Sequence, residues 1–237
     1  MDRLTTLSRR AKHIYQSEGL IAMLRRGFLF LDYCFLDYRE YWLYADPTPN
    51  GPTLNEADFM PRVDDFTFRI VTSNQQADEM EIQGLEFRSQ VPNVVEKLDK
   101  GAVSFCVFVG SELAHIGWVA TTQEARDCIG EPPYRVDFAN HETCLGGIWT
   151  SPKYRRLGLR RYARFKLDEL LLSRNVVRSR GAILKSNTAA IRSRPEHFPP
   201  PYAEGRYLRI LWWKSWREMP LSAEEQEAMR QTNGSHS

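Results

Sequence analysis

Residues 148–162 read IWTSPKYRRLGLRRY, and the fold class can be inferred from them. It begins as a short apolar strand that ends at Ser151-Pro152, continues as a basic loop with one glycine, and opens a helix predicted over 159–173. The helix carries apolar residues at three- and four-residue steps along one face, which indicates that this face packs against a core. A strand, a tight basic loop and an amphipathic helix in succession are typical of an α/β domain.

The basic loop has the chemistry of a diphosphate-binding site. The first N–H groups of a helix have no internal acceptor, and the helix dipole makes that end positive. Loop amides that lead into the helix can therefore converge on phosphate oxygens. Gly158 lets the backbone approach those oxygens closely, and Arg155, Arg156 and Arg160 would add charge-assisted hydrogen bonds.

Residues 155–160 resemble the Gln/Arg-x-x-Gly-x-Gly/Ala motif that follows the fourth strand of GCN5-related N-acetyltransferases (GNAT). Arg155 and Gly158 match the first two defined positions, whereas Arg160 stands where the family has Gly or Ala. Asn187 follows the next predicted strand and opens a short helix, which is similar to the family's Asn-containing segment. The resemblance covers residues 66–216, and only the loop is specific.

The resemblance implies a mixed α/β sheet with a GNAT-like acyl-CoA N-acyltransferase fold, acetyl-CoA or another acyl-CoA as co-substrate, and no metal. The fourth and fifth strands would splay apart, and an amine would attack the thioester directly between them. A main-chain N–H near Ile148 would polarise the thioester carbonyl. The expected cofactor-binding residues are Ile148, Trp149, Thr150, Arg155, Arg156, Leu157, Gly158, Leu159, Arg160 and Asn187.

The same resemblance implies two catalytic roles. A base must accept the proton of the attacking amine, and the family often places one just before the fourth strand, where Glu142 is the first candidate. His141 is the second, and Asp137 lies in the same segment. A tyrosine would protonate the departing CoA thiolate, with Tyr202 the nearest candidate and Tyr207 the alternative.

Composition patterns divide the chain into four regions. Residues 1–45 are predicted to form a helical, aromatic-rich N-terminal extension, and residues 46–64 a Pro-rich linker. Residues 65–220 are expected to be the GNAT-like domain that the resemblance implies, with the order strand, two helices, hairpin, strand, helix, strand, helix and strand. Residues 221–237 are polar and are expected to be a disordered tail.

Overall composition excludes several classes of protein. The 237 residues carry a formal net charge of +2 and four cysteines without a CxxC pair, so neither a zinc site nor a disulfide framework is indicated. Reduced thiols favour the cytoplasm. The N-terminus does not have the pattern of a signal peptide, and no apolar run is long enough to span a bilayer.

Parts of the sequence are also consistent with two functions other than acyl transfer. Residues 153–180 carry ten Lys or Arg against two acidic residues, a charge that suits nucleic acid as well as a diphosphate. Aromatic residues are not interleaved with these charges, so nucleic-acid binding is not expected. The second alternative is a GNAT-fold module with weakened catalysis that binds a membrane surface or a partner, which the departure at Arg160 keeps open.

The partners implied are few. The acceptor would be a small-molecule or protein amine, with a hydroxyl as a further option. Residues 1–35 place basic side chains opposite Leu, Ile and Phe, a pattern that suits an anionic membrane surface. Packing of that apolar face on the domain, or on a second subunit of a homodimer, is the alternative that we favour.

Overall fold

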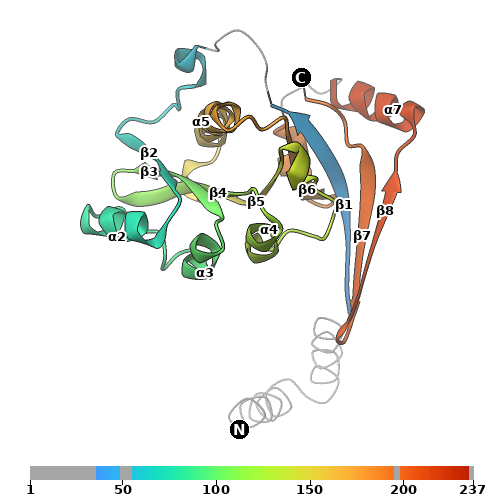
Figure 1. Ribbon diagram of the computed structural model, residues 1–237. Helices are drawn as coiled ribbons and strands as arrows, with labels where there is room; N and C mark the ends of the chain where they lie inside the picture. The colour runs from blue at the N-terminus through green and yellow to red at the C-terminus, as the bar shows by residue number, and fades with distance from the viewer. Residues whose placement is uncertain (1–35, 49–54, 195–197, 235–237) are drawn as a thin grey trace, which may run out of the picture.

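The computed structural model describes residues 36–48, 55–194 and 198–234, which form one eight-stranded mixed sheet with helices on both faces (Figure 1). The sheet order is β2-β3-β4-β5-β6-β1-β7-β8. The strands are β1 (Leu36–Pro47), β2 (Phe66–Val71), β3 (Val103–Val109), β4 (Glu112–Ala120), β5 (Glu142–Thr150), β6 (Arg178–Leu184), β7 (Ala203–Ile210) and β8 (Trp213–Pro220). The predicted mixed α/β fold class is confirmed.

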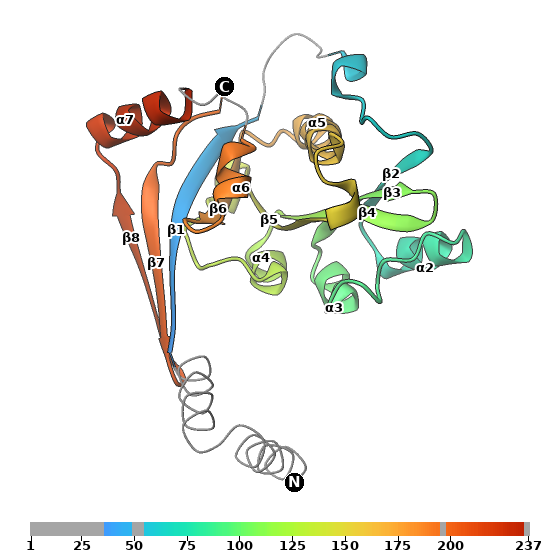
Figure 2. The same ribbon diagram turned by 180° about the vertical axis from the view of Figure 1, so that it is seen from behind.

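Helices cover the two faces of the sheet differently. On one face lie α2 (Asn74–Ile82), α3 (Val94–Asp99) and α4 (Gln123–Ile129), whereas α5 (Leu159–Ser173) covers the other (Figures 1 and 2). The remaining α-helices are α6 (Thr188–Arg192) and α7 (Ala223–Gly234), and single 3-10 turns are η1 (Glu56–Phe59), η2 (Phe138–Asn140) and η3 (Pro152–Tyr154). No helix among the described residues is long and apolar enough to cross a membrane.

Two hydrophobic cores follow from this arrangement. The larger core joins the sheet to α2, α3 and α4 around Trp118, Phe108 and Tyr134. The second core joins the sheet to α5 through Leu159 and Leu167. Strand β3 contributes to both cores, because its alternate side chains face opposite sides of the sheet, which explains its nearly unbroken apolar sequence.

The N-terminal region differs from its sequence-based prediction. Residues 36–47 are not part of a helical extension but form β1, which lies inside the sheet and pairs antiparallel with both β6 and β7. Aromatic and aliphatic side chains that alternate along this segment suit a strand, and burial of Leu43 and Tyr44 follows from its central position. Residues 1–35 lie outside the described part of the chain, so the helix predicted there stays a prediction.

Four other elements differ from expectation. Residues 223–234 of the predicted disordered tail form α7, which begins just after Ser222. The predicted final strand over 207–213 is instead a hairpin of β7 and β8. The part of the predicted linker at η1 packs on α5, where Phe59 stacks on Phe165 with ring centroids 4.7 Å apart. Helix α4 was missed by the sequence reading altogether.

Candidate active site

Strands β5 and β6 begin as neighbours and then part. They pair in parallel only at Glu142–Arg178, Thr143–Ser179 and Cys144–Arg180. Beyond these three pairs β5 continues beside β4 alone, and β6 beside β1. The side chains of Ile148 and Trp149, on the parted section of β5, are exposed. The splay expected from the resemblance is therefore present in the strand pairing.

A β-bulge interrupts the pairing of β5 with β4 at this point. The register shifts between Ile116 and Trp118, opposite Gly147 and Ile148, and Gly146 is the last paired residue before it. Gly147 has φ +57, in the left-handed region that favours glycine. Such a bulge re-aims the groups that follow it. It lies between the paired start of β5 and its exposed end.

The loop after β5 packs against residues 60–62, where Arg62 N donates to Leu157 O across 2.8 Å. Arg156 and Gly158 have φ +65 and +87, so the chain turns sharply before α5 begins at Leu159. Leu159 and Tyr154 anchor the loop by burial, and the Tyr154 hydroxyl donates to Glu112 Oε2 across 2.7 Å. A side chain on Gly158 would meet Pro61 Cα at 3.5 Å.

Consecutive backbone amides of this loop have no hydrogen-bond acceptor among the described residues. Within the described part of the chain, the N–H groups of residues 156–161 have no hydrogen-bond acceptor, whereas Tyr154 N donates to Ser151 and Tyr162 N to Gly158. These groups lie on the loop and in the first turn of α5. Unpaired amides at the positive end of a fifteen-residue helix suit an anion with several oxygens.

Arginine side chains surround the same helix start. Arg194 donates to both oxygens of the buried Asp46, at 2.6 and 3.2 Å, and Arg164 lies 3.8 Å from the same carboxylate. Arg160 Nη1 donates to Ser193 Oγ across 2.6 Å, which directs this guanidinium to α6. Burial and the nearby Arg194 and Arg164 lower the pKa of Arg160, as expected where cations gather.

Two other residues near the loop have defined partners. Asn187 caps α6, because its Oδ1 accepts from Ala190 N across 3.1 Å. His115 on β4 is buried, and its Nδ1 lies 2.8 Å from Thr150 Oγ1 at the end of β5. Burial, with a smaller effect of Arg160, lowers the pKa of His115 to about 3, so its imidazole is neutral. No partner among the described residues reaches His115 Nε2.

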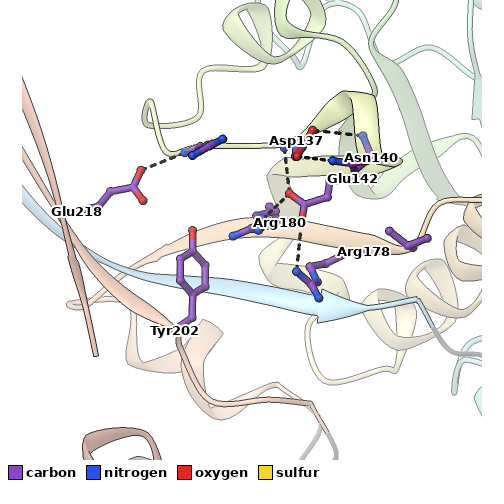
Figure 3. Close-up of a pocket in the computed structure, with 9 residues that line it drawn as sticks. Asp137, Asn140, Glu142, Arg178, Arg180, Tyr202 and Glu218 are labelled. Atoms are coloured by element: carbon purple, nitrogen blue, oxygen red, sulfur yellow. Dashed lines mark hydrogen bonds and ion pairs between the residues drawn. The ribbon is translucent and has the colours of Figure 1, made fainter. Parts of the chain in front are cut away.

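The predicted catalytic residues Glu142 and Tyr202 line one cavity of about 500 Å³, together with Arg180 (Figure 3). Arg180 binds both oxygens of Glu142, with Nε–Oε2 2.7 Å and Nη2–Oε1 2.8 Å. Arg178 adds a contact of 3.3 Å. Burial acts to raise the pKa of Glu142, but the bonds from Arg180 and the Asp137 N–H outweigh it and hold the pKa below 4.5. The Arg180 guanidinium also lies 5.0 Å from the centre of the Tyr202 ring.

The other sequence candidates in this region have separate places. The Asp137 carboxylate accepts a hydrogen bond from Asn140 Nδ2 across 2.8 Å. This bond lowers the pKa of Asp137, and its effect is larger than that of burial, which acts to raise the pKa. His141 follows η2 with φ +57. We call the cavity of Glu142 and Tyr202 the Glu142 cavity. It lies where β5 and β6 are still paired, not where they part.

A carboxylate that the sequence reading missed lies at the bulge of β5. Glu131 follows Gly130, the left-handed cap of α4, and its Oε1 accepts from Gly147 N across 3.3 Å. A Cβ on Gly146 would lie 2.2 Å from this oxygen, so only glycine there admits the carboxylate. Burial raises the pKa of Glu131 from 4.5 to about 7. The hydrogen bond from Gly147 N–H and the charge of Arg126 act to lower this pKa, but their effects are smaller.

Glu131 lines a second cavity of about 460 Å³, which we call the Glu131 cavity. Its other walls come from β1 and the β7–β8 hairpin, with Tyr41, Tyr207 and Trp216 as the aromatic residues. Tyr207, the alternative acid of the sequence reading, therefore shares a cavity with Glu131, whereas Tyr202 does not. No local sequence signal marks Glu131, because its environment depends on strands distant in the chain.

No metal cluster accompanies these groups. Within residues 36–48, 55–194 and 198–234, no set of three or more His, Cys, Asp or Glu side chains is arranged to hold a metal ion. Cys106 and Cys144 are buried free thiols, and burial raises the pKa of each to about 12. Both therefore act as small apolar groups in the core.

Comparison with known proteins gives a likeness of overall structure only. No protein-family model matches the sequence, and no curated protein matches it either. Solved structures with a similar arrangement include a functionally unknown conserved protein from Staphylococcus epidermidis, with 9% identity over 77% of this chain and a TM-score of 0.45. A GCN5-related N-acetyltransferase from Sphaerobacter thermophilus has 11% identity over 86% and a TM-score of 0.40. A tandem GNAT protein from the clavulanic acid biosynthesis pathway has 14% identity over 70% of this chain and a TM-score of 0.41.

These likenesses assign no role to any residue. The present chain spans 66%, 58% and 52% of the length of those three structures, in the same order. Identity and TM-score are both low, so the case for a function rests on this chain's own strand pairing, loop and cavities.

Proposed function

We propose that this chain is an acyltransferase that transfers an acetyl or other acyl group from acyl-CoA to an amine. The observation that carries the proposal is the row of unpaired amides at residues 156–161, at the start of α5 and directly after the parted section of β5. A diphosphate would take these N–H groups as donors, and the charges of Arg155, Arg156 and Arg160 would add to the attraction. The pantetheine arm would then run along Ile148 to Thr150.

Glu131 is the base in this proposal, in place of Glu142. Glu142 lies six residues before Ile148, which is ~20 Å along an extended strand, too far for a direct proton transfer at a thioester near Ile148. Its two arginine partners also lower its affinity for a proton. Glu131 touches the bulge one residue before Ile148, and a pKa near 7 suits a base at neutral pH.

The acyl group would pass from the thioester to the amine in one step. The amine nitrogen attacks the thioester carbonyl carbon, a C–N bond forms, and the C–S bond breaks. Glu131 takes the amine proton, and the CoA thiolate leaves and is protonated. Tyr207 supplies that proton in our proposal, because it lines the Glu131 cavity, whereas Tyr202 lies beside Arg180 in the Glu142 cavity. A main-chain N–H near Ile148 would stabilise the charge on the carbonyl oxygen.

The acceptor would enter through the Glu131 cavity. Its aromatic walls and the carboxylates of Glu131 and Asp37 would hold the acceptor, and Arg39 and Lys214 in the same lining favour an amine that arrives neutral. The Asp37 carboxylate accepts a hydrogen bond from Arg39 Nε across 2.8 Å. Glu131 is therefore the carboxylate of this cavity that we expect to contact the acceptor amine. Asn187, as the cap of α6, would contribute to CoA binding through the position of that helix.

The test measures binding and chemistry separately. Thermal melting with and without acetyl-CoA reports binding, and release of free CoA thiol in the presence of a panel of amines reports transfer. A ligand at ~100 times its dissociation constant adds about 2.7 kcal/mol to the stability of the folded form. If acetyl-CoA leaves the melting temperature unchanged at millimolar concentration, the proposal is wrong. Stabilisation without thiol release from any amine would favour the binding module with weakened catalysis.

A further inference from the structure

The hairpin of β7 and β8 ends in exposed apolar side chains. Trp212 and Trp213 are 85% and 54% exposed, and Ile210 and Leu211 beside them are exposed as well. Figures 1 and 2 show that β1, β7 and β8 run together beyond the helices, with the hairpin turn at their far end. Leu211 holds the turn in the left-handed region at φ +58, an unfavourable conformation for a side chain of this size.

Strand β1 extends the same surface. Leu36 pairs with Ile210 and Tyr38 with Leu208, and both Leu36 and Tyr38 are exposed. We define the apolar tip as Leu36, Tyr38, Ile210, Leu211, Trp212 and Trp213. Exposed apolar side chains gathered at one end of a molecule mark an interaction site, because isolated ones are ordinary but clusters are rare.

Cations surround the apolar tip. Residues 205–217 read GRYLRILWWKSWR, with four Lys or Arg and no acidic residue. Arg206 pairs with Glu204 and Glu40 across the sheet. Lys214 and Arg217 are exposed on β8, and neither has an ion-pair partner in the described part of the chain. The hairpin therefore joins aromatic side chains to uncompensated positive charge.

We propose that the apolar tip docks on the surface of an anionic lipid bilayer. Tryptophan and tyrosine favour the headgroup region, where an apolar ring and a polar N–H or O–H are both satisfied. Lys214 and Arg217 would lie against negatively charged headgroups, each adding to the attraction.

A second copy of the chain is a less suitable occupant. Strand β8 is at the edge of the sheet, and an edge can pair with another chain. The exposed cations Lys214 and Arg217 lie along that edge, and Pro220 ends it. Charged side chains and proline on an edge strand oppose pairing, and two such edges would also repel each other. The proposal does not depend on the transferase activity.

Flotation of the full chain with lipid vesicles tests the proposal. Vesicles of phosphatidylcholine with phosphatidylglycerol should carry the protein upward, and phosphatidylcholine alone should carry much less. The double variant Trp212→Ser/Trp213→Ser should remain at the bottom of the gradient. Lys214→Gln and Arg217→Gln should each weaken partitioning about fivefold. Ile82→Ser is the matched control, since Ile82 is 86% exposed on α2 and lies outside the apolar tip.

Four results would overturn the proposal. The wild-type chain fails to float with anionic vesicles. The Trp212→Ser/Trp213→Ser variant floats as well as wild type, which would move the contact to another segment. The wild-type chain is a dimer that the same variant dissociates, which would make a second copy the occupant. The variant melts at a lower temperature than wild type without lipid, which would mean that the tip is covered by its own chain.

Discussion

The N–H of Gly147 donates to Oε1 of Glu131 across 3.3 Å, and this bond ties the loop after α4 to the bulge of β5. It places a carboxylate of raised pKa beside the section of β5 that parts from β6. The bond also explains why two consecutive glycines lie at and directly before the bulge. Gly147 takes a left-handed φ, and Gly146 leaves space for the carboxylate.

Glu131→Gln should lower kcat about 10²- to 10⁴-fold, the usual effect of losing a general base. Acetyl-CoA should still raise the melting temperature, because the amides of residues 156–161 are unchanged. Glu124→Gln on the same helix-loop segment is the matched control and should keep full activity. Equal activity of Glu131→Gln and wild type would remove Glu131 as the base.

The pH dependence follows from the raised pKa of Glu131. As a base it must be ionised, so kcat/KM should rise with pH and level off above about 7. Stability should change in the opposite direction. Between pH 4.5 and about 7, the folded state keeps the Glu131 proton that the unfolded state has released. Protonated Glu131 therefore stabilises the folded state at low pH, and this stabilisation is lost as pH rises from 4.5 to about 7. Urea titrations of wild type and Glu131→Gln should diverge in that window, and parallel curves would contradict the prediction.

Gly146→Ala tests the contact between Glu131 and the bulge. The new Cβ would lie 2.2 Å from Glu131 Oε1, so the carboxylate must move away from Gly147 N. We expect kcat to fall by at least tenfold, since small displacements of a catalytic group are costly. A double-mutant cycle with Glu131→Gln checks the cause, because Gly146→Ala should add little once the carboxylate is gone. Fully additive effects would show that the alanine acts elsewhere.

Gly158→Glu should abolish the stabilisation by acetyl-CoA. A side chain at φ +87 is strained, and a glutamate there would displace the loop and its amides, because its Cβ already lies 3.5 Å from Pro61 Cα. In wild type the expected gain is about 5–10 °C at ~100 times the dissociation constant. Gly84→Glu is the control, because Gly84 has φ +81 with no atom within 4 Å of its added Cβ. Both variants should melt lower without ligand, and only the Gly84 variant should respond to acetyl-CoA.

Glu142→Gln should act on stability rather than on chemistry. Removing one partner of a buried ion pair leaves Arg180 uncompensated, and the cost is about 3 kcal/mol. Because the fold lowers the pKa of Glu142, its contribution is present above 4.5 and is lost as pH falls through the depressed value. Guanidinium titrations at neutral pH measure the loss. A stable variant with greatly reduced turnover would instead restore the base role predicted from the sequence.

The loop and α5 could be predicted because their signals are local. A proline turn, a glycine and an amphipathic helix lie in consecutive residues, and α5 begins and ends where the pattern predicted, at Leu159 and Ser173. Strand β1 could not be placed this way, because its neighbours β6 and β7 are more than 130 residues away. Strand pairing at that distance leaves no periodic signal in the chain.

The candidate site divides in the same way. The arginines of the loop were visible in sequence, whereas the pKa of Glu131 depends on burial by β1, the hairpin and the β5 bulge. Glu142 was chosen for its position before a strand, and only the folded chain brings Arg180 to its carboxylate. Local patterns thus predict backbone geometry well, but not the electrostatic partners of a side chain.

The central place of β1 has a consequence for synthesis. Strand β1 is the first of the eight described strands to be synthesised, whereas β6 and β7, which flank it in the sheet, are the sixth and seventh. The sheet between β6 and β7 therefore stays incomplete until almost the whole polypeptide is available, and long-range closure of this kind is slow. A fragment that starts at residue 65 would lack the strand between β6 and β7, leaving two unpaired edges that invite aggregation.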